Sequence, residues 1–335
     1  MVEVVRGVAM SALRKDRPAA KGLPIVRQAR ELLWAVQDQL TTLRSIARSQ
    51  NRLVSAQEMH LRRIEMLVDR LSREHLEEAS KRYADARHLA RFERQVFSQS
   101  GEDGILAEVF RRIGEGARTC VEFGVGDGLE NNTAFLLCQG WRGWWLEGDT
   151  ELVRQIETGL GPLIARGQLR VEACFIESSS IAGKFETLGV PVEVDLLSID
   201  IDGNDYWVWK ALIERKWRPR VVVIEYNAIF PPGVRWTILE NPAHRWDGSG
   251  YQGASLTALV ELAETCGYAL VGCSRNGVNA FFVRRDLVSD SFCGPFSAEN
   301  FYELPGYGAN SKLGHRRSYA MLVAGAAIAL GGVSL

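Results

Sequence analysis

The chain has 335 residues, more than a typical domain of roughly 100 to 150, so we expect one main domain and an accessory element. Hydrophobic residues make up 46% of the sequence and charged residues 24%, which is ordinary for a globular protein. The formal net charge of −1 produces no overall field that would attract a polyanion, so we expect no nucleic-acid partner.

Charge is distributed unevenly along the chain: residues 1–100 hold 19 of the 40 Lys and Arg residues but only 12 of the 41 Asp and Glu residues. Residues 1–24 are expected to be flexible, and they contain no apolar stretch long enough for a secretory signal. The six cysteines form no C-x-x-C pair and show no disulfide-like spacing, which indicates reduced thiols. We therefore expect a cytoplasmic protein.

The front of the chain has a helical pattern. No glycine and no proline occurs between Pro24 and Gly101, which predicts a helical region over residues 25–96. Within residues 33–71, alternating steps of three and four residues find apolar side chains at ten of twelve positions. A pattern sustained over about five heptads favours a coiled coil and a homo-oligomer joined through this segment. The alternative is an amphipathic helix that folds back on its own chain.

After residue 97, short aliphatic runs alternate with helical patterns, as expected for a sheet covered by helices on both faces. The last two predicted strands are adjacent and follow a helix over Ser255–Cys266. This arrangement fits a seven-stranded Rossmann-like sheet better than the six-strand dinucleotide order. We place this α/β domain at residues 97–290. The predicted strands are Thr119–Phe123, Arg142–Leu146, Leu169–Phe175, Val194–Ile199, Arg220–Tyr226, Ala269–Cys273 and Asn279–Val283.

A glycine-rich turn follows the first of these strands. Glycines there let the chain turn sharply and bring backbone amides close to a ligand, at the start of a helix. A dinucleotide fingerprint would need a third glycine at the position of Leu129. The observed E-x-G-x-G-x-G is typical of S-adenosylmethionine sites, which makes Glu122, Gly124, Gly126 and Gly128 candidate cofactor-binding residues.

Glu147 ends the second predicted strand. A carboxylate at that place can accept hydrogen bonds from both hydroxyls of a ribose, as an acid does in nucleotide sites. Glu147 is therefore a further candidate cofactor-binding residue, and the alternative is a solvated loop glutamate.

Carboxylates follow the fourth and fifth predicted strands: Asp200, Asp202 and Asp205 after one, and Glu225 at the end of the other. The carboxyl ends of strands line the ligand crevice of an open α/β sheet, so these acids should converge. They suit a general base that deprotonates an acceptor hydroxyl. The carboxylates of Asp200, Asp202 and Glu225 could equally serve as oxygen ligands of Mg²⁺. The structural alternative is that Asp200 and Asp202 cap the following helix.

His244 lies in a long segment after the fifth predicted strand, where it could close over a substrate. An imidazole is suited to act as a base near neutral pH, so His244 is a further catalytic candidate. The alternative is a loop histidine with a structural hydrogen bond.

Several ordered motifs together resemble the FkbM-type methyltransferase family. That family reads approximately S-Q-x-G-E-D, a D-x-G-A turn, N-T, G-W-R-G and D-x-E-G, in this order. The resemblance covers about residues 97–285. The matching stretches of this chain are Phe97–Gly104, Glu122–Gly128, Asn132–Thr133, Gly140–Gly143 and Asp200–Gly203.

This resemblance implies a class I fold, S-adenosylmethionine as cofactor and O-methylation of a sugar or natural-product hydroxyl. Through the resemblance alone, Gln99, Glu102 and Asp103 become candidate pocket residues. The chain departs from the family at Glu122 and Val125, where Asp and Ala are usual, and at Asp202, which replaces a glutamate.

Residues 291–335 form a C-terminal extension. Its last sixteen residues, from Ala320, are apolar except for Ser334, which is shorter than the roughly 20 residues that a membrane-crossing helix needs. Two interpretations stay open. The segment docks on the core or frays, or it makes a peripheral contact with the inner face of the membrane.

The sequence therefore predicts an S-adenosylmethionine-dependent O-methyltransferase acting on a saccharide, a glycolipid or a natural product. One alternative is an NAD-dependent Rossmann oxidoreductase. Another is a non-catalytic coiled-coil assembly protein of a glycan-modifying complex.

Overall fold

The computed structural model describes residues 83–306 and 317–329, with isolated positions 34, 36, 38, 39, 41, 63–67 and 70. By its contacts the chain divides into two compact units, residues 1–68 and 69–335. The flexible segment at 1–24 and the heptad pattern of 33–71 lie outside the described residues, apart from those isolated positions. The coiled coil and the homo-oligomer therefore stay predictions.

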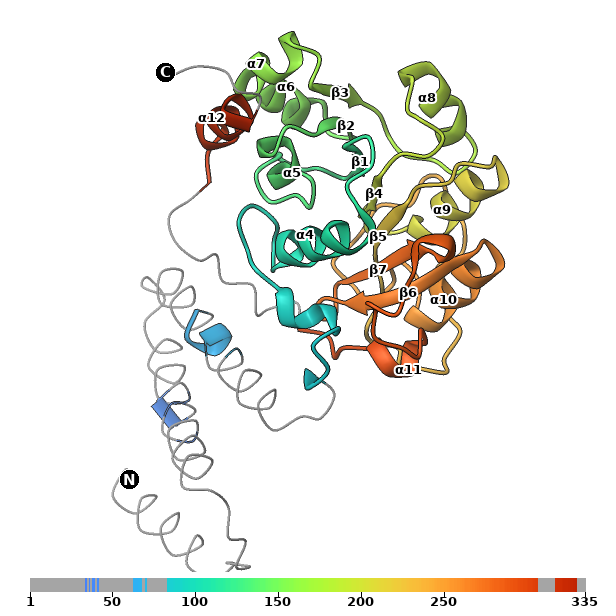
Figure 1. Cartoon of the computed structure of the whole chain (residues 1–335). Coiled ribbons are helices and arrows are strands. Elements are labelled where there is room, and N and C mark those ends of the chain that lie inside the picture. The colour runs from blue at the N-terminus through green and yellow to red at the C-terminus, as the bar shows by residue number, and fades with distance from the viewer. Residues whose placement is uncertain are drawn as a thin grey trace, which may run out of the picture. The chain divides into compact units, whose positions relative to one another are not determined.

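The second unit is built on a seven-stranded sheet with the order β3-β2-β1-β4-β5-β7-β6 (Figure 1). Strand β7 runs antiparallel to β5 and β6, and the other neighbours are parallel. All seven strands predicted from the sequence are present, and this order is that of a Rossmann-like methyltransferase sheet. The strands are β1 Thr119–Phe123, β2 Arg142–Glu147, β3 Leu169–Ala173, β4 Leu196–Ile199, β5 Val221–Glu225, β6 Tyr268–Cys273 and β7 Asn279–Arg284.

Helices cover both faces of this sheet, because its central strands are buried on both sides and need apolar partners. One layer contains α4, α5, α6, α7 and α12, and the other α8, α9 and α10 (Figure 1). The helices are α4 Glu102–Ile113, α5 Ala134–Cys138, α6 Thr150–Gly159, α7 Gly161–Ala165, α8 Ile181–Leu188, α9 Asp205–Glu214, α10 Leu256–Thr265, α11 Ala298–Phe301 and α12 Tyr319–Ala329, with short 3₁₀ helices η2 Leu89–Phe92 and η3 Arg285–Leu287.

Alternation along the strands separates two apolar cores. In β5, for example, Val222 and Ile224 belong to the core under α8, α9 and α10, whereas Val221 and Val223 belong to the other. Successive side chains of a strand point to opposite faces, so each strand contributes to both layers. The carboxyl ends of the parallel strands are left for the connecting segments, and this edge carries the site.

The predicted helical region over residues 25–96 is wrong for its last part. Residues 83–96 contain only η2 as a regular helix, although no glycine or proline interrupts them. Leu89 and Ala90 are fully buried, and Leu89 packs closely on Gly272 of β6. Tertiary packing of these side chains against the sheet therefore overrides the local helix pattern.

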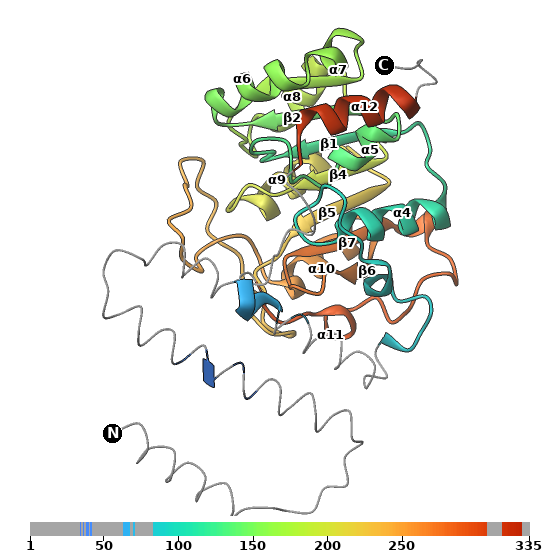
Figure 2. The ribbon, with the colours of Figure 1, turned by 90° about the vertical axis from the view of Figure 1, so that its left-hand side faces the viewer.

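The C-terminal segment docks on the second unit. Helix α12 lies along α5 in both Figure 1 and Figure 2, and it buries Leu322 and Ala326 there. The hydroxyl of Tyr319 donates to the carbonyl of Asp127 in the glycine-rich turn, at 2.7 Å. Among the described residues, none of the helices has the length and apolar character needed to cross a membrane. A peripheral membrane contact stays a prediction.

Gly325→Val should weaken the docking of α12. A Cβ atom at Gly325 would lie 2.9 Å from Cβ and Sγ of Cys138, so a larger side chain forces the two helices apart. We expect a loss of about 1 to 3 kcal/mol in the free energy of unfolding, measured by denaturant titration. The matched control is Ala329→Val on the exposed side of the same helix. An equal loss in both variants would contradict this packing.

Candidate functional site

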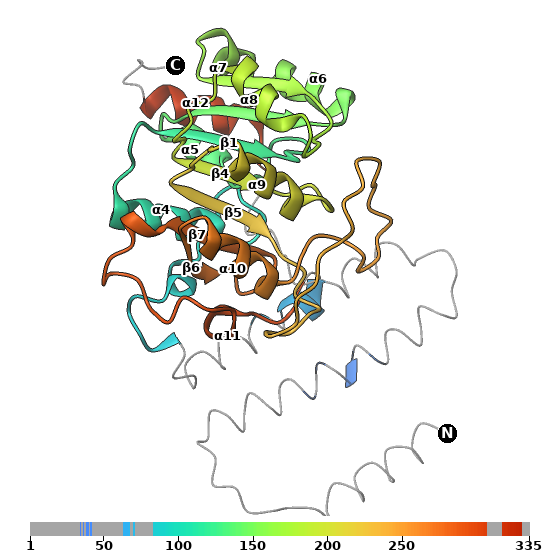
Figure 3. The same cartoon turned by 90° about the vertical axis from the view of Figure 1, so that its right-hand side faces the viewer.

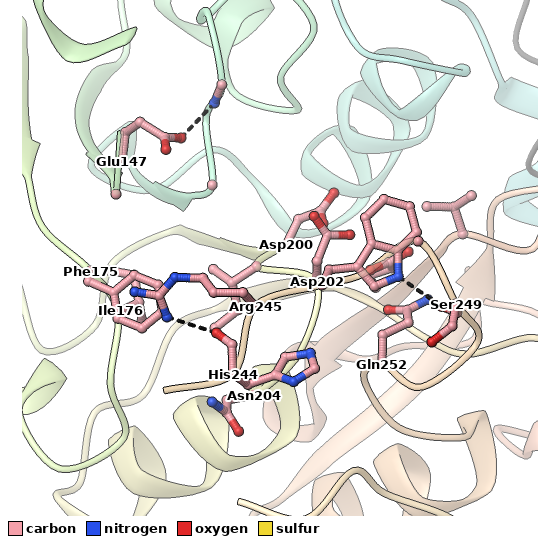
Figure 4. Close-up of a pocket in the computed structure, with 18 of the residues that line it drawn as sticks. Glu147, Phe175, Ile176, Asp200, Asp202, Asn204, His244, Arg245, Ser249 and Gln252 are labelled. Atoms are coloured by element: carbon pink, nitrogen blue, oxygen red, sulfur yellow. Dashed lines mark hydrogen bonds between the residues drawn. The ribbon is translucent and has the colours of Figure 1, made fainter. Parts of the chain in front are cut away.

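A cavity of about 1010 Å³ opens at the carboxyl ends of the parallel strands. Its walls come from the turn after β1, the ends of β2, β4 and β5, and the segment that follows β5 (Figure 4). Polar groups of opposite halves of the sheet thus face one shared cavity. The predicted site residues that line it are Gln99, Gly124, Gly126, Glu147, Asp200, Asp202, Glu225 and His244.

The glycine-rich turn forms one side of the cavity. Gly124 has φ +67°, and a Cβ atom there would lie 1.8 Å from the carbonyl oxygen of Asp200. Only glycine allows this close approach between the ends of β1 and β4. Gly126 also has a positive φ, +55°, but no atom lies within 4 Å of where its Cβ would be. The turn is therefore packed at Gly124 and open at Gly126.

Glu147 joins β2 to this turn. Its Oε2 accepts a hydrogen bond from the amide of Gly126 at 2.8 Å, and its Oε1 accepts one from the amide of Asp149 at 2.9 Å. Figure 4 shows the first of these bonds at the edge of the cavity. A carboxylate oxygen has a second lone pair, so Glu147 can still accept from a ligand.

Four predicted site residues do not line the cavity, and each has a structural contact instead. Gly128 packs against Trp145, whose ring would lie 2.8 Å from a Cβ atom at that position. Oδ2 of Asp103 accepts from the amides of residues 96, 97 and 98, each at 2.8 Å. Oε2 of Glu102 accepts from the amides of Ser100 and Gly101. These two acids shape the segment that carries Gln99.

Glu122 is the fourth of these residues and is buried in the sheet. Its carboxylate accepts hydrogen bonds from the amides of Asn132 and Thr133, at 2.8 and 3.0 Å, and from the hydroxyl of Thr133. Burial raises the pKa of Glu122 to about 7, although these bonds favour the ionised form. Glu122 holds the start of α5 against β1 and does not reach the cavity.

Glu122→Gln should change how stability depends on pH. The pKa of Glu122 rises from 4.5 in the unfolded chain to about 7 in the fold, so its contribution is fully present below pH 4.5. That contribution is lost as the pH rises through about 7, by roughly 3 kcal/mol in total. Between pH 4 and about 8, we expect the free energy of unfolding of the wild type to fall by this amount relative to that of the variant, as measured by denaturant titration. Parallel pH profiles would contradict the shift.

Three carboxylates meet on the opposite side of the cavity. Ligand oxygens of Asp200, Asp202 and Glu225 all lie within 4.8 Å of one another. Burial, and then the charges of the neighbouring acids, raise the pKa values of Asp200 and Glu225 well above their usual range. The carboxyl ends of β4 and β5 therefore bring the predicted acids together.

The chain between β4 and α9 is organised by Asp205, which accepts hydrogen bonds from the amides of Ile201 and Gly203 at 2.9 Å each. Asp202 sits in this turn with φ +52°, a left-handed conformation that costs energy for residues other than glycine. Such strain is concentrated at functional sites. Asp205 supports the backbone, and the exposed Asp202 is left to face the cavity.

His244 packs on this turn from the other side. A Cβ atom at Gly203 would lie 2.5 Å from the imidazole ring, so the glycine makes room for it. Nε2 of His244 is buried and has no hydrogen-bond partner. The imidazole also interacts electrostatically with Asp202, whose pKa burial raises and His244 lowers.

The segment between β5 and α10 supplies most of the site that motifs did not reveal. It has no regular element except an isolated bridge between Thr237 and Ala254, and it projects beyond the carboxyl end of β5 (Figure 3). Its Arg245 stacks on the ring of Phe175 at 3.5 Å, and Gln252 lies deeper in the cavity. The length of this segment was the only available sequence signal, since long loops are usually functional.

No protein-family model matches the chain, and a comparison with curated proteins finds no match. Solved methyltransferase structures resemble it in part. Magnesium protoporphyrin IX methyltransferase (ChlM) from Synechocystis shares 11% identity over 55% of this chain and 77% of that chain, with a TM-score of 0.35. The glycopeptide N-methyltransferase MtfA shares 13% over 54% and 88%, with a TM-score of 0.35.

WbdD shares 13% identity over 55% of this chain and 39% of that chain, with a TM-score of 0.36. At these identities and TM-scores the matches add nothing to the fold assignment, which rests on the strand order described above.

Proposed function

We propose that this protein is an S-adenosylmethionine-dependent O-methyltransferase that acts on a hydroxyl of a saccharide, a glycolipid or a natural product. One observation carries the proposal. A single cavity has a glycine turn and Glu147 on one side, and three carboxylates with His244 on the other. A transfer reaction needs both a donor half and an acceptor half, and the ordered FkbM-type motifs support the same assignment.

The residues of the donor half suit S-adenosylmethionine. The open space above Gly126 admits the amino-acid part of the cofactor to the turn, and Glu147 can accept hydrogen bonds from the ribose hydroxyls. When bound, this cofactor supplies a methyl group already activated on a sulfonium. The task of the chain is therefore to hold the acceptor oxygen in line and to remove its proton.

The acceptor half performs that task. Asp202 and Glu225 accept hydrogen bonds from acceptor hydroxyls and orient them, and the imidazole of His244, which lines the cavity, takes the proton of the reacting hydroxyl. Asp202 stabilises the imidazolium that forms, since the two side chains interact electrostatically. The segment after β5 reduces the access of water to this part of the cavity.

The rim of the cavity supports a ring-shaped acceptor. Phe175 and Trp246 both line the cavity, yet they are 40% and 51% exposed. Arg245 covers one face of the Phe175 ring, and the exposed ring of Trp246 offers a stacking surface for a sugar ring or an aromatic ring. The carboxylates below them supply the hydrogen-bond acceptors that hydroxyl groups require.

Calorimetry on the full chain tests the donor half. S-adenosylmethionine should bind the wild type, and Gly126→Val should weaken binding by roughly tenfold or more because its side chain fills the open space. NADH is the control ligand. Binding of NADH without binding of S-adenosylmethionine would favour an oxidoreductase instead. Cofactor binding without methylation of any component of a cell extract would favour an assembly protein.

A further inference from the structure

We infer that Asp200, Asp202 and Glu225, together with Oε1 of Gln252, bind a divalent cation of the Mg²⁺ or Mn²⁺ type. The inference goes beyond methyl transfer, because a cation can bind these oxygens whether or not a methyl group is transferred.

The spacing of the three carboxylates fits a single ion. Their ligand oxygens lie within 4.8 Å of one another. Oxygens bound to one ion at about 2.1 to 2.5 Å can be no more than about 4 to 5 Å apart, so only small side-chain movements are needed. Carboxylates from two adjacent strands are thus close enough to share one cation after small side-chain movements.

Lys and Arg side chains of the described residues do not neutralise this cluster. Within residues 83–306 and 317–329, none of the ion pairs made by Lys or Arg involves these carboxylates. Arg245 also lines the cavity, but its guanidinium stacks on Phe175 and donates to the carbonyl of His244. Buried carboxylates are normally paired or coordinate a metal.

Gln252 provides an independent observation. Only 7% of this residue is exposed, and it lies in the wall of the same cavity. Its side-chain amide is hydrogen-bonded to the carboxylate of Glu225, so the two side chains adjoin. Neither Oε1 of Gln252 nor Oε2 of Glu225 has a hydrogen-bond partner. Two neighbouring side chains that each keep a buried oxygen atom without a hydrogen-bond partner indicate a bound group that oxygen atoms coordinate.

A shared proton is the competing explanation. A proton between Asp200 and Glu225 would satisfy those two groups, but it would leave Oε1 of Gln252 without a partner. A cation satisfies all four oxygens together. Because every donor is oxygen, the site selects a hard cation rather than a soft one.

The cation would also define how the acceptor binds, and this step rests on the proposed function. An octahedral ion held by protein oxygens on one side keeps open positions toward the cavity. An acceptor hydroxyl that occupied such a position would lose its proton more readily. The substrate class is then a hydroxyl compound that can coordinate a metal.

The test is a titration of the metal-stripped full chain with Mn²⁺, followed by electron paramagnetic resonance. The wild type should bind one Mn²⁺. Loss of a supporting group around a metal typically costs about 10- to 100-fold in affinity, so Asp202→Asn and Glu225→Gln should lose at least that much. Gln252→Leu should weaken binding by about tenfold. The control is Asp247→Asn, an exposed acid of the same segment that does not line the cavity.

Absence of Mn²⁺ binding by the wild type, or equal binding by all variants, would overturn the inference. Circular dichroism verifies that each variant is folded, and Asp202 is exposed, so its replacement should preserve the fold. Calorimetry with S-adenosylmethionine in the absence of metal separates the two proposals. Cofactor binding without Mn²⁺ binding rejects only the cation, whereas Mn²⁺ binding without cofactor binding rejects only methyl transfer.

Discussion

Gly124→Ala should lower the free energy of unfolding by about 3 to 5 kcal/mol. Two costs combine at this position. The backbone has φ +67°, which strains any residue other than glycine, and the new Cβ would lie 1.8 Å from the carbonyl oxygen of Asp200. The ends of β1 and β4 would have to separate.

Gly126→Ala is the matched control in the same turn. Its φ of +55° imposes a similar backbone cost, but the space around its Cβ is empty. We expect a loss of about 1 kcal/mol, so the two variants should differ by at least about 2 kcal/mol in urea titrations. If both variants lost the same free energy of unfolding, backbone conformation alone would explain the two losses. The predicted close contact with Asp200 would then be contradicted.

His244→Ala should reduce the rate of methyl transfer by about 10²- to 10⁴-fold, because it removes the proposed base. S-adenosylmethionine affinity should stay within about threefold of the wild type, since the donor half is untouched. The rate is measured as S-adenosylhomocysteine formed in the presence of a cell extract that contains the acceptor.

Added imidazole distinguishes a base from a merely structural histidine. The alanine variant leaves a gap above Gly203, so free imidazole should restore part of the rate, with dependence on the imidazole concentration. Glu240→Gln, an exposed change in the same segment, should retain the wild-type rate. A rate loss in His244→Ala that imidazole does not reverse would remove His244 as the base.

Residue pattern alone was sufficient for the sheet. Runs such as Leu196–Ile199 and Val221–Glu225 are short and mostly apolar, which is typical of buried parallel strands. Acids that follow such strands must meet, since the carboxyl ends of parallel strands share one edge. The convergence of Asp200, Asp202 and Glu225 was therefore predictable.

The local sequence pattern does not distinguish the polar residues that face a ligand from those with a structural contact. Glu102, Asp103 and Glu122 have the same chemistry as the acids of the cavity, but each accepts hydrogen bonds from backbone amides and lies outside the cavity wall. Gln252 belongs to no motif, and only the path of the segment after β5 brings it to Glu225.

The sequence by itself determined the seven strands, the glycine turn and the edge of the sheet that carries the acids, because these depend on periodicity and on local backbone freedom. Only the tertiary structure decided that residues 83–96 are not a helix, that α12 docks on α5, and which carboxylates keep free oxygens. The physical reason is that hydrogen-bond partners and packing neighbours come from distant parts of the chain, which no local pattern records.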